Sequence, residues 1–413
     1  MANIRPFKCV RPAEGKAEQI AALPYDVYNR QEAKEVVANA PLSFLNIDRA
    51  ETQFDDSVDT YDERVYAKAK ELLDGMIANG DFVTDEEAKY YIYELTMNGR
   101  AQTGIVACSS IDDYLYNIIK KHENTREDKE IDRIKHVDTC NAQTGPIFLA
   151  YRSNDVINQA VSAEKENAPI YDFVSSDGVG HRVWIVTDAE RENAIREAFN
   201  GMQEIYIADG HHRAASAVKV GLKRRNENPE YDGTEEFNYF LSVLFPDDQL
   251  MIMDYNRVVK DLNGLSKFGF FDEIKRLFNI TNVSAEPVAP SNKGEVAMFY
   301  ENTWYMLAAK SELVNTEDPV KALDVSYLQD NLLGPVLGIE DPRTDKRIDF
   351  VGGIRGLSEL ERRVQSDMIV AFAMYPTSIK ELFDVADAGM LMPPKSTWFE
   401  PKLRSGLFIH KLS

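Results

Sequence analysis

The chain has 413 residues, which is too long for one ordinary hydrophobic core and predicts two or three domains. Hydrophobic residues make up 44% of the sequence and aromatic residues 10%, a composition typical of a folded protein and not of a disordered one. The formal net charge is −21, from 68 acidic and 47 basic residues. A surface this negative repels phosphate backbones and disfavours a general nucleic-acid-binding role, although a local basic pocket for one small phosphate compound stays compatible with it.

The cysteines and the chain start carry no sign of secretion. Cys9, Cys108 and Cys140 are far apart and fit neither a disulfide framework nor a zinc site, so we expect buried, inert thiols in a reducing cytosol. The first residues lack the apolar core of a signal peptide, and no apolar run approaches the roughly 20 residues that cross a bilayer. We expect a cytoplasmic protein with no membrane partner.

The apolar pattern predicts an α+β fold with mixed sheets. We expect three domains: an N-terminal α+β extension (1–100), a central core (101–250) and a C-terminal α+β domain (251–413). The expected elements, in chain order, are helices at 31–39 and 61–79; strands at 90–96, 102–108, 147–151, 170–174 and 182–187; a helix at 190–199; a strand at 204–208; a helix at 214–225; strands at 237–245 and 251–253; a helix at 265–277; strands at 295–300 and 303–308; a helix at 358–367; a strand at 368–374; a helix at 378–386; and a strand at 407–410.

A charged stretch at 112–133 has helical composition and is interrupted near His122–Asn124. Thr125 and Asp128 have the spacing of a capping box, which predicts that a second helix starts there. Glu123 lies just ahead of this helix start, where a carboxylate can reach a neighbouring cleft and serve as general base. The residues alone favour a different interpretation, a solvated helix with Arg126 and Glu130 paired at i,i+4 spacing.

The strongest local signal is the run Asp209-Gly210-His211-His212-Arg213 between a predicted strand and a predicted helix. Gly210 permits a tight turn, and the free N–H groups of a helix start, with the positive end of the helix dipole, form an anion site. Arg213 adds a forked cation, and the histidines add donors or proton carriers. Asp209 can orient a histidine or hold a phosphate-bound Mg²⁺. The alternative is an ordinary helix start capped by Asp209.

Two further runs are weaker candidates. In Pro393-Pro394-Lys395-Ser396-Thr397, a lysine and two hydroxyls follow a rigid Pro-Pro pair and can wrap phosphate oxygens, or form only a polar loop. In Pro24-Tyr25-Asp26 a turn is expected, with a site role for Asp26 as the alternative. The Walker A loop, the protein-kinase motifs, the dinucleotide fingerprint and the H-E-x-x-H zinc motif are all absent. Nucleotide chemistry therefore requires another scaffold.

The strand–Asp209-Gly210-His211-His212-Arg213–helix unit resembles the phosphate-binding motif of the ParB/sulfiredoxin-like fold. It is similar in particular to the free L-serine kinases, in which a His-Glu pair precedes this motif and a Pro-Lys-hydroxyl-Thr loop lies near the C-terminus. His122-Glu123 and Pro394-Lys395-Ser396-Thr397 match these in the same order. Over its whole length the chain resembles a bacterial conserved family of unknown function that shares the Pro-Tyr-Asp-Val, His-Glu-x-Thr, Asp-Gly-His-His-Arg and Lys-Ser-Thr motifs.

The resemblance implies a kinase that makes O-phosphoserine from free L-serine with ATP or ADP and Mg²⁺. Glu123 takes the hydroxyl proton, and Asp209 holds the nucleotide-bound Mg²⁺ or assists as a second acid or base. The implied partners are a nucleotide and an amino acid; a homo-oligomer is compatible with the sequence. The remaining implied site residues are Gly210, His211, His212 and Arg213 around the phosphates, Lys395, Ser396 and Thr397 over nucleotide or substrate, and Asp26, His122 and Arg126 at the substrate.

Several features depart from the resemblance. The stretch between Glu123 and Asp209 is longer than in compact archaeal kinases, residues 1–100 have no counterpart there, and Asn256 stands where the family has histidine. Two other classes therefore stay open. A ParB-like nucleotide switch or hydrolase would keep the phosphate cradle and would not need Glu123. A non-catalytic regulatory protein would tolerate the loss of both Glu123 and Asp209.

Overall fold

The computed structural model describes residues 1–413, which cluster into two compact units. The first unit contains Met1–Lys121, Thr125–Leu250 and Pro401–Ser413, and the second contains His122–Asn124 and Met251–Glu400. The expected border at residue 100 falls at the first residue of a hairpin strand, Arg100–Ser110, so residues on both sides of it build the same sheet. No helix has an apolar stretch long enough to span a bilayer.

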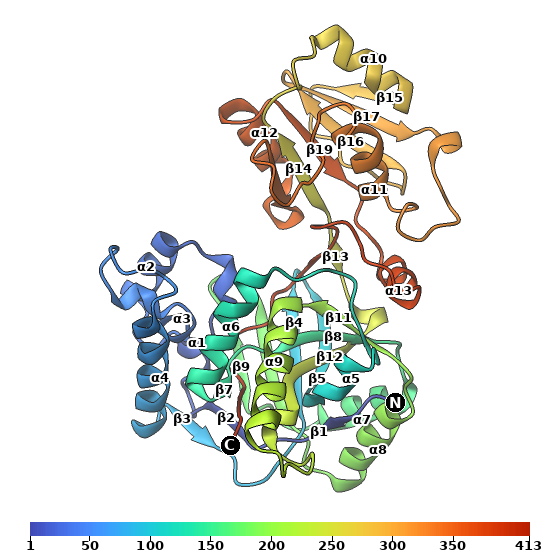
Figure 1. Cartoon of the computed structure of the whole chain (residues 1–413). Helices are drawn as coiled ribbons and strands as arrows, with labels where there is room; N and C mark the ends of the chain where they lie inside the picture. The colour runs from blue at the N-terminus through green and yellow to red at the C-terminus, as the bar shows by residue number, and fades with distance from the viewer. The chain divides into compact units, whose positions relative to one another are not determined.

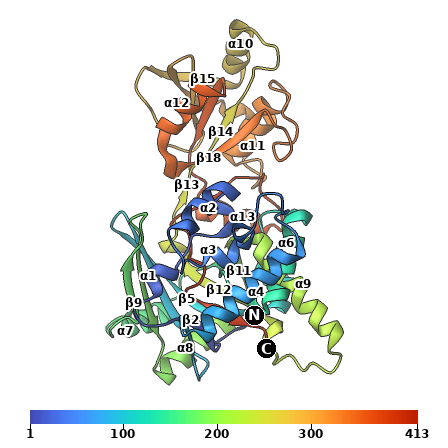
Figure 2. The same cartoon turned by 90° about the vertical axis from the view of Figure 1, so that its left-hand side faces the viewer.

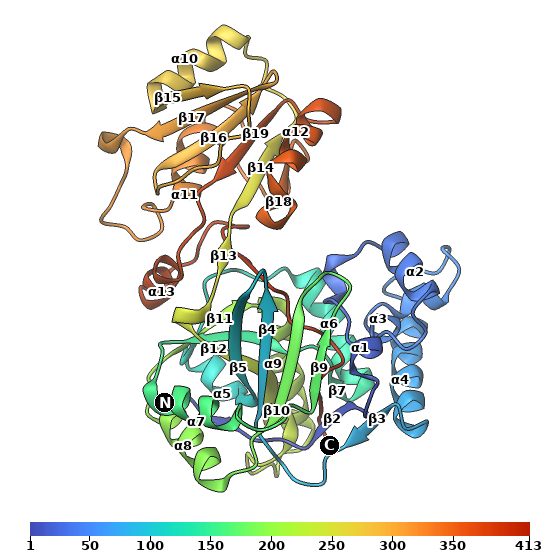
Figure 3. The same ribbon diagram turned by 180° about the vertical axis from the view of Figure 1, so that it is seen from behind.

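The first unit is built on a 9-stranded mixed sheet (Figures 1 and 3). Two neighbouring pairs, β6–β11 and β8–β12, are parallel, and the other pairs are antiparallel. A second sheet of four antiparallel strands joins the two ends of the sequence. In sheet order the large sheet contains β6 (Ile119–Lys120), β11 (Ile205–Asp209), β8 (Ile147–Tyr151), β12 (Tyr239–Pro246), β5 (Arg100–Ser110), β4 (Tyr91–Met97), β10 (Gly180–Ile185) and β9 (Tyr171–Val174), with β1 (Ile4–Arg5) also on β5; the small sheet contains β3 (Phe82–Thr84), β2 (Cys9–Pro12), β21 (Ile409–Lys411) and β7 (Ala142–Gln143).

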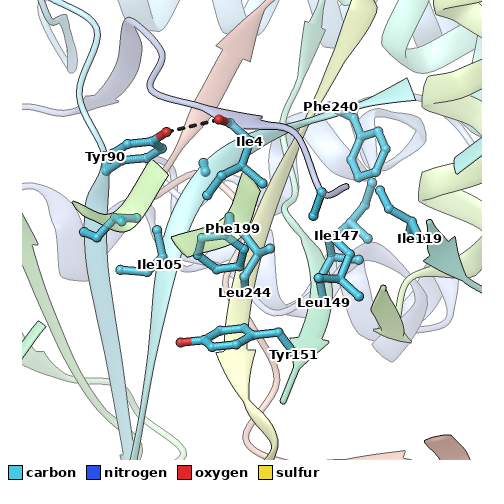
Figure 4. Packing of buried hydrophobic residues seen from close by; sticks show 14 of the residues in the cluster. Ile4, Tyr90, Ile105, Ile119, Ile147, Leu149, Tyr151, Phe199, Phe240 and Leu244 are labelled. Atoms are coloured by element: carbon cyan, nitrogen blue, oxygen red, sulfur yellow. Dashed lines mark hydrogen bonds between the residues drawn. The ribbon is translucent and has the colours of Figure 1, made fainter. Parts of the chain in front are cut away.

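Helices cover one face of the large sheet, and other helices pack against one face of the small sheet. Alternate residues of β5, β8, β11 and β12 face a buried core with residues of α7, α8 and α9, as period-2 strands and amphipathic helices require (Figure 4). A second core lies beneath α2, α3 and α4 (Figure 2). The helices of the unit are α1 (Ala17–Ile20), α2 (Arg30–Ala38), α3 (Leu45–Asp48), α4 (Glu63–Ala78), α5 (Ile111–Leu115), α6 (Glu127–Cys140), α7 (Asp155–Glu164), α8 (Ala189–Asn200) and α9 (His211–Glu227).

Pro401–Ser413, the last segment of the chain, packs against the opposite face of the large sheet at β4. Phe408 packs on Tyr91 and Tyr93 with ring centroids 5.6 Å apart in each pair. At the next residue β21 begins, and it joins the small sheet between β2 and β7. The segment is thereby held along its length in the first unit.

His181 on β10 lies fully buried beneath this segment. Its ring nitrogens contact the Tyr93 hydroxyl at 2.8 Å and the Ser175 hydroxyl at 2.9 Å. Burial, together with the charge of Arg404, lowers the pKa of His181 to about 3. The imidazole is therefore neutral in the folded protein.

This burial predicts an acid-side loss of stability. Below pH ~6.5 the unfolded chain protonates this histidine and the folded chain does not, so the free energy of unfolding falls as the pH drops from about 6.5 towards 3. The slope from this one group is about 1.4 kcal/mol per pH unit. Urea denaturation at pH 6 and pH 4 is expected to show a smaller pH-dependent loss for His181→Gln than for the wild type; equal losses would contradict the assignment.

The second unit holds a 6-stranded antiparallel sheet and a separate strand pair, β13 (Ile252–Met253) with β20 (Trp398–Phe399), where the chain enters and leaves the unit (Figure 1). A core of buried residues lies between the sheet and α12. In sheet order the strands are β15 (Phe278–Ser284), β17 (Thr303–Ala309), β16 (Glu295–Tyr300), β19 (Val370–Met374), β14 (Tyr255–Val259) and β18 (Ile348–Gly352); the helices are α10 (Lys267–Leu277), α11 (Asp324–Leu328), α12 (Gly356–Ser366) and α13 (Ile379–Asp387).

The expected α+β class with mixed sheets is confirmed, whereas the prediction for 112–133 is wrong in part. α5 ends at Leu115, β6 occupies Ile119–Lys120, and α6 begins at Glu127. The capping box is absent: the Thr125 hydroxyl bonds Glu130, which also pairs with Lys219. The Arg126 guanidinium pairs with Asp128 at 2.8 Å and not with Glu130.

All three cysteines are buried free thiols, as expected. Burial is the main cause that raises the pKa of each, to about 12 for Cys140. Such thiols stay protonated and unreactive.

Candidate functional site

The run Asp209–Arg213 lies where β11 ends and α9 begins. β11 ends at Asp209, Gly210 alone makes the connection with φ of 93°, and α9 starts at His211. Only glycine adopts this backbone conformation without steric cost. Gly210 supplies no capping side chain, and the first turn of α9 has no acidic residue. The positive end of this 17-residue helix therefore has no neutralising group in its own first turn, which favours an anionic ligand.

Asp209 is a carboxylate held between cations. Its Oδ1 accepts the Gly210 N–H at 2.8 Å, and its Oδ2 accepts from the Lys402 Nζ at 3.1 Å. Burial alone would raise the pKa of Asp209, but the charges of Lys402 and Arg213 outweigh it and hold that pKa well below the usual range. The side chain is nevertheless 35% exposed. Asp209 is thus a permanently ionised, accessible carboxylate, suited to holding a cation and unsuited to carrying a proton.

Arg213 folds back over the turn. A Cβ on residue 210 would lie 3.1 Å from the Arg213 Nε, so a larger residue there would displace the guanidinium by a few tenths of an ångström. The Arg213 Nη1 donates to the Pro146 carbonyl at 2.8 Å. This bond fixes one edge of the guanidinium within the first unit.

The two histidines occupy the first turn of α9 in different surroundings. His211 is buried, with 6% of its surface exposed. His212 Nε2 accepts the backbone N–H of Arg126 at 3.0 Å, which places the proton of the neutral ring on Nδ1. Arg126 therefore reaches the run through its backbone, while its guanidinium pairs with Asp128.

Asp26 is exposed on a single 3-10 turn, Tyr25–Val27. Its neighbour Tyr25 instead faces inward, with its ring centroid 4.0 Å from the Arg133 guanidinium. In this turn Tyr25 is the residue that packs into the protein. A role of Asp26 in substrate binding stays a prediction.

In the second unit, the His122–Asn124 segment lies beside the Lys395 loop. The His122 carbonyl accepts the Met392 N–H at 2.8 Å. Lys395 is exposed with φ of 60°, and its Nζ lies 5.5 Å from the Tyr255 ring centroid. Ser396 is buried, and its hydroxyl donates to the Pro393 carbonyl at 2.6 Å. The Ser396 hydroxyl therefore closes the turn, and Lys395 and the half-buried Thr397 are the polar side chains of the loop with access to solvent.

Arg257 supports this loop from β14. The Arg257 Nη2 donates to the Lys395 carbonyl at 3.0 Å, and the guanidinium lies 5.4 Å from the Phe350 ring centroid. Only 3% of Arg257 is exposed, and its hydrogen-bond acceptors are the backbone carbonyls of Tyr255 and Lys395, not carboxylates. Burial lowers the pKa of Arg257 to about 10. A buried, uncompensated cation is costly, and a bound anion would relieve that cost.

Sequence reasoning missed Lys402 and Arg257. Lys402 lies 193 residues from its partner Asp209, and no local pattern distinguishes it from other lysines. Arg257 sits in an apolar strand, and an arginine within such a run is the one signal that could have drawn attention to it.

The fold and this turn define an α+β protein in which a strand ends at an ionised carboxylate beside an uncapped helix start. Residues 4–326 match the model of DUF1015, a protein family of unknown function, and the chain belongs to that family. The expected membership of a conserved family of unknown function is thereby confirmed. No curated protein matches the sequence.

Three solved structures resemble the chain at low identity. SbnI with a C-terminal truncation from Staphylococcus aureus is 11% identical over 71% of this chain and 82% of its own, with a TM-score of 0.39. A free serine kinase in complex with AMP is 16% identical over 74% and 91%, with a TM-score of 0.36. A conserved hypothetical protein from Pyrococcus furiosus is 16% identical over 74% and 94%, with a TM-score of 0.34. Similarities this weak do not establish a shared activity.

Proposed function

We propose that the protein is a small-molecule kinase that transfers a phosphoryl group from ATP or ADP to the hydroxyl of free L-serine. The observation that carries the proposal is the turn at Asp209-Gly210: an accessible carboxylate kept ionised by Lys402 and Arg213 directly precedes an uncapped helix start. Phosphoryl transfer depends mainly on such positioning and charge neutralisation. The order of Glu123, this turn and Lys395–Thr397 along the chain matches the free L-serine kinases.

Each group has one role in the proposed reaction. Glu123 accepts the proton of the serine hydroxyl as that oxygen attacks the terminal phosphorus and the bond to the leaving nucleotide oxygen breaks. The helix start at Gly210, with His211, His212 and Arg213, binds the phosphates, and Lys395 and Thr397 contact nucleotide or substrate. Asp209 fits a Mg²⁺ that accompanies the nucleotide, because Mg²⁺ prefers carboxylate oxygens; when bound, the ion neutralises phosphate charge.

The direct test is product formation. Purified protein is incubated with L-serine, Mg²⁺ and separately ATP, ADP or CTP, and O-phosphoserine is measured by mass spectrometry. Phosphoserine with one donor supports the kinase and identifies that donor. Nucleotide turnover without phosphoserine would move the function to a hydrolase or to another acceptor, and no turnover with any nucleotide would contradict catalysis altogether.

Arg257→Met is expected to weaken nucleotide binding about 10-fold or more. The substitution removes both the buried charge and the hydrogen bond to the Lys395 carbonyl, and hydrogen bonds to charged groups are worth about 1.5–3 kcal/mol. The dissociation constant is measured by isothermal titration calorimetry, with Arg276→Met, an exposed arginine of α10, as the matched control. Equal affinities for the two variants would exclude Arg257 from the nucleotide site.

A further inference from the structure

A polar cavity lies within the first unit, beside Arg213. Its lining comes from segments far apart in the chain and includes Tyr25, Asp48, Arg133, His136, Arg213 and Ser405. The centre of a water molecule can occupy about 30 Å³ of it. That space admits the charged end of a small molecule and is far too small for a nucleotide.

Asp48 is the informative residue of this cavity. It ends α3 with only 5% of its surface exposed, and its Oδ1 accepts from the Thr144 hydroxyl at 3.1 Å. No cation pairs with Asp48, and no protein donor bonds its Oδ2. A buried carboxylate of this kind is costly unless a cation or donor reaches it. The Arg133 charge acts on Asp48 from within the same cavity, and the Asp48 Oδ2 is left open to a donor such as an ammonium group.

The cavity also carries positive charge. The Arg133 guanidinium pairs through one edge with Asp132 at 2.8 Å and is covered by the Tyr25 ring. Arg213 uses its Nη1 on the Pro146 carbonyl, and neither its Nε nor its Nη2 has a protein acceptor. Two guanidinium groups with donors left over favour a carboxylate.

His136 adds an acceptor. Its Nε2 lies 3.3 Å from the Ile47 carbonyl, which can only accept, so the proton is on Nε2 and Nδ1 accepts. Burial and the charge of Arg133 lower the pKa of His136, which keeps this ring neutral. An ammonium group can thus find acceptors at both Asp48 and His136.

A simple anion would face Asp48, and a simple cation would face the two arginines. A group that carries both charges can bind Asp48 and both arginines at once. We infer that this cavity binds the ammonium and carboxylate groups of a free α-amino acid. The inference deepens the proposed function, on which it rests, by assigning the acceptor's charged end to Asp48, Arg133 and Arg213 next to the Asp209–Arg213 turn.

Isothermal titration calorimetry on the full chain, with and without ADP, tests this binding. L-Serine is compared with ethanolamine, which lacks the carboxylate, and with 3-hydroxypropanoate, which lacks the ammonium. L-Serine is expected to bind at least 10-fold more tightly than either analogue. Asp48→Asn is expected to weaken serine binding at least 10-fold, whereas the exposed control Asp56→Asn is expected to leave it unchanged. Thermal melts of both variants separate lost binding from unfolding.

Several outcomes would overturn the assignment. These are equal binding of either analogue, no serine binding by the wild type in either condition, or unchanged serine affinity in a folded Asp48→Asn protein. Phosphoserine formation with an unchanged KM for serine in Asp48→Asn would remove the cavity from the acceptor site and leave the kinase standing. Serine binding that depends on Asp48, without any phosphoserine, would keep the amino-acid site and overturn the kinase.

Discussion

Glu123→Gln is expected to lower the rate of phosphoserine formation by ~10²–10⁴-fold, because the amide cannot take the hydroxyl proton. Nucleotide affinity is expected to change little, since this carboxylate is assigned to the acceptor and not to the phosphates. The measurement is kcat by phosphoserine mass spectrometry together with the dissociation constant for ADP.

Glu127→Gln is the matched control for this prediction. It makes the same change four residues later, at an exposed position in the first turn of α6. A control as slow as Glu123→Gln would mean that the loss reflects a damaged helix start. A Glu123→Gln protein of wild-type rate would remove the general base from the mechanism and favour a hydrolase or a switch.

Asp209→Asn is expected to lower kcat by ~10²–10³-fold, the second of the two largest effects. The amide retains the shape of the side chain but cannot supply the negative charge that a phosphate-bound cation requires. The substitution also removes the ion pair between Asp209 and the Lys402 ammonium, which is only 16% exposed, so the melting temperature is expected to fall as well.

Two variants separate the catalytic loss from the structural one. Asp248→Asn changes an exposed aspartate of the same unit and is expected to match the wild type in rate and melting temperature. Lys402→Met breaks the same ion pair but keeps the Asp209 carboxylate, and is expected to retain more activity than Asp209→Asn. If both partners of the pair reduce the rate equally, Asp209 acts only by holding the C-terminal segment.

The sequence predicted the first unit best where the signal was local. Asn98 and Gly99 have positive φ values of 53° and 77°, the conformation that an Asn-Gly hairpin turn requires, and the strands expected on both sides are β4 and β5. α4 ends one residue before Asn79, with Gly80 in the left-handed conformation, as expected of a helix C-cap.

Predictions failed where distant contacts decide the structure. Residues 112–133 have helical composition, but Ile119–Lys120 pairs in parallel with β11, some 86 positions away in the register Ile119–Ile205. Glu130 bonds Lys219 on α9 in place of Arg126. Parallel pairing and helix–helix ion pairs of this kind leave no periodic trace within a short window of sequence.

In the candidate site, too, local signals were predicted and distant contacts were not. The Asp209–Arg213 turn was visible because glycine between a strand and a helix is a local requirement. The groups that set its electrostatics, Lys402 above all, come from segments whose nearness only the folded chain reveals. Asp48 and Arg133 were likewise hidden, since a buried charge looks like a surface charge in the sequence.

The return of Pro401–Ser413 to the first unit has a consequence for biosynthesis. Apart from His122–Asn124, the second unit is an insertion between Leu250 and Pro401, so Lys402 emerges from the ribosome only after the whole insertion has been made. Until then Asp209 lacks its ion-pair partner, the large sheet lacks its covering segment, and β2 lacks its neighbour β21. A nascent chain stalled within the insertion therefore carries the complete Asp209–Arg213 motif without the Lys402 charge. Only a chain translated past the insertion acquires the charge balance that the motif requires.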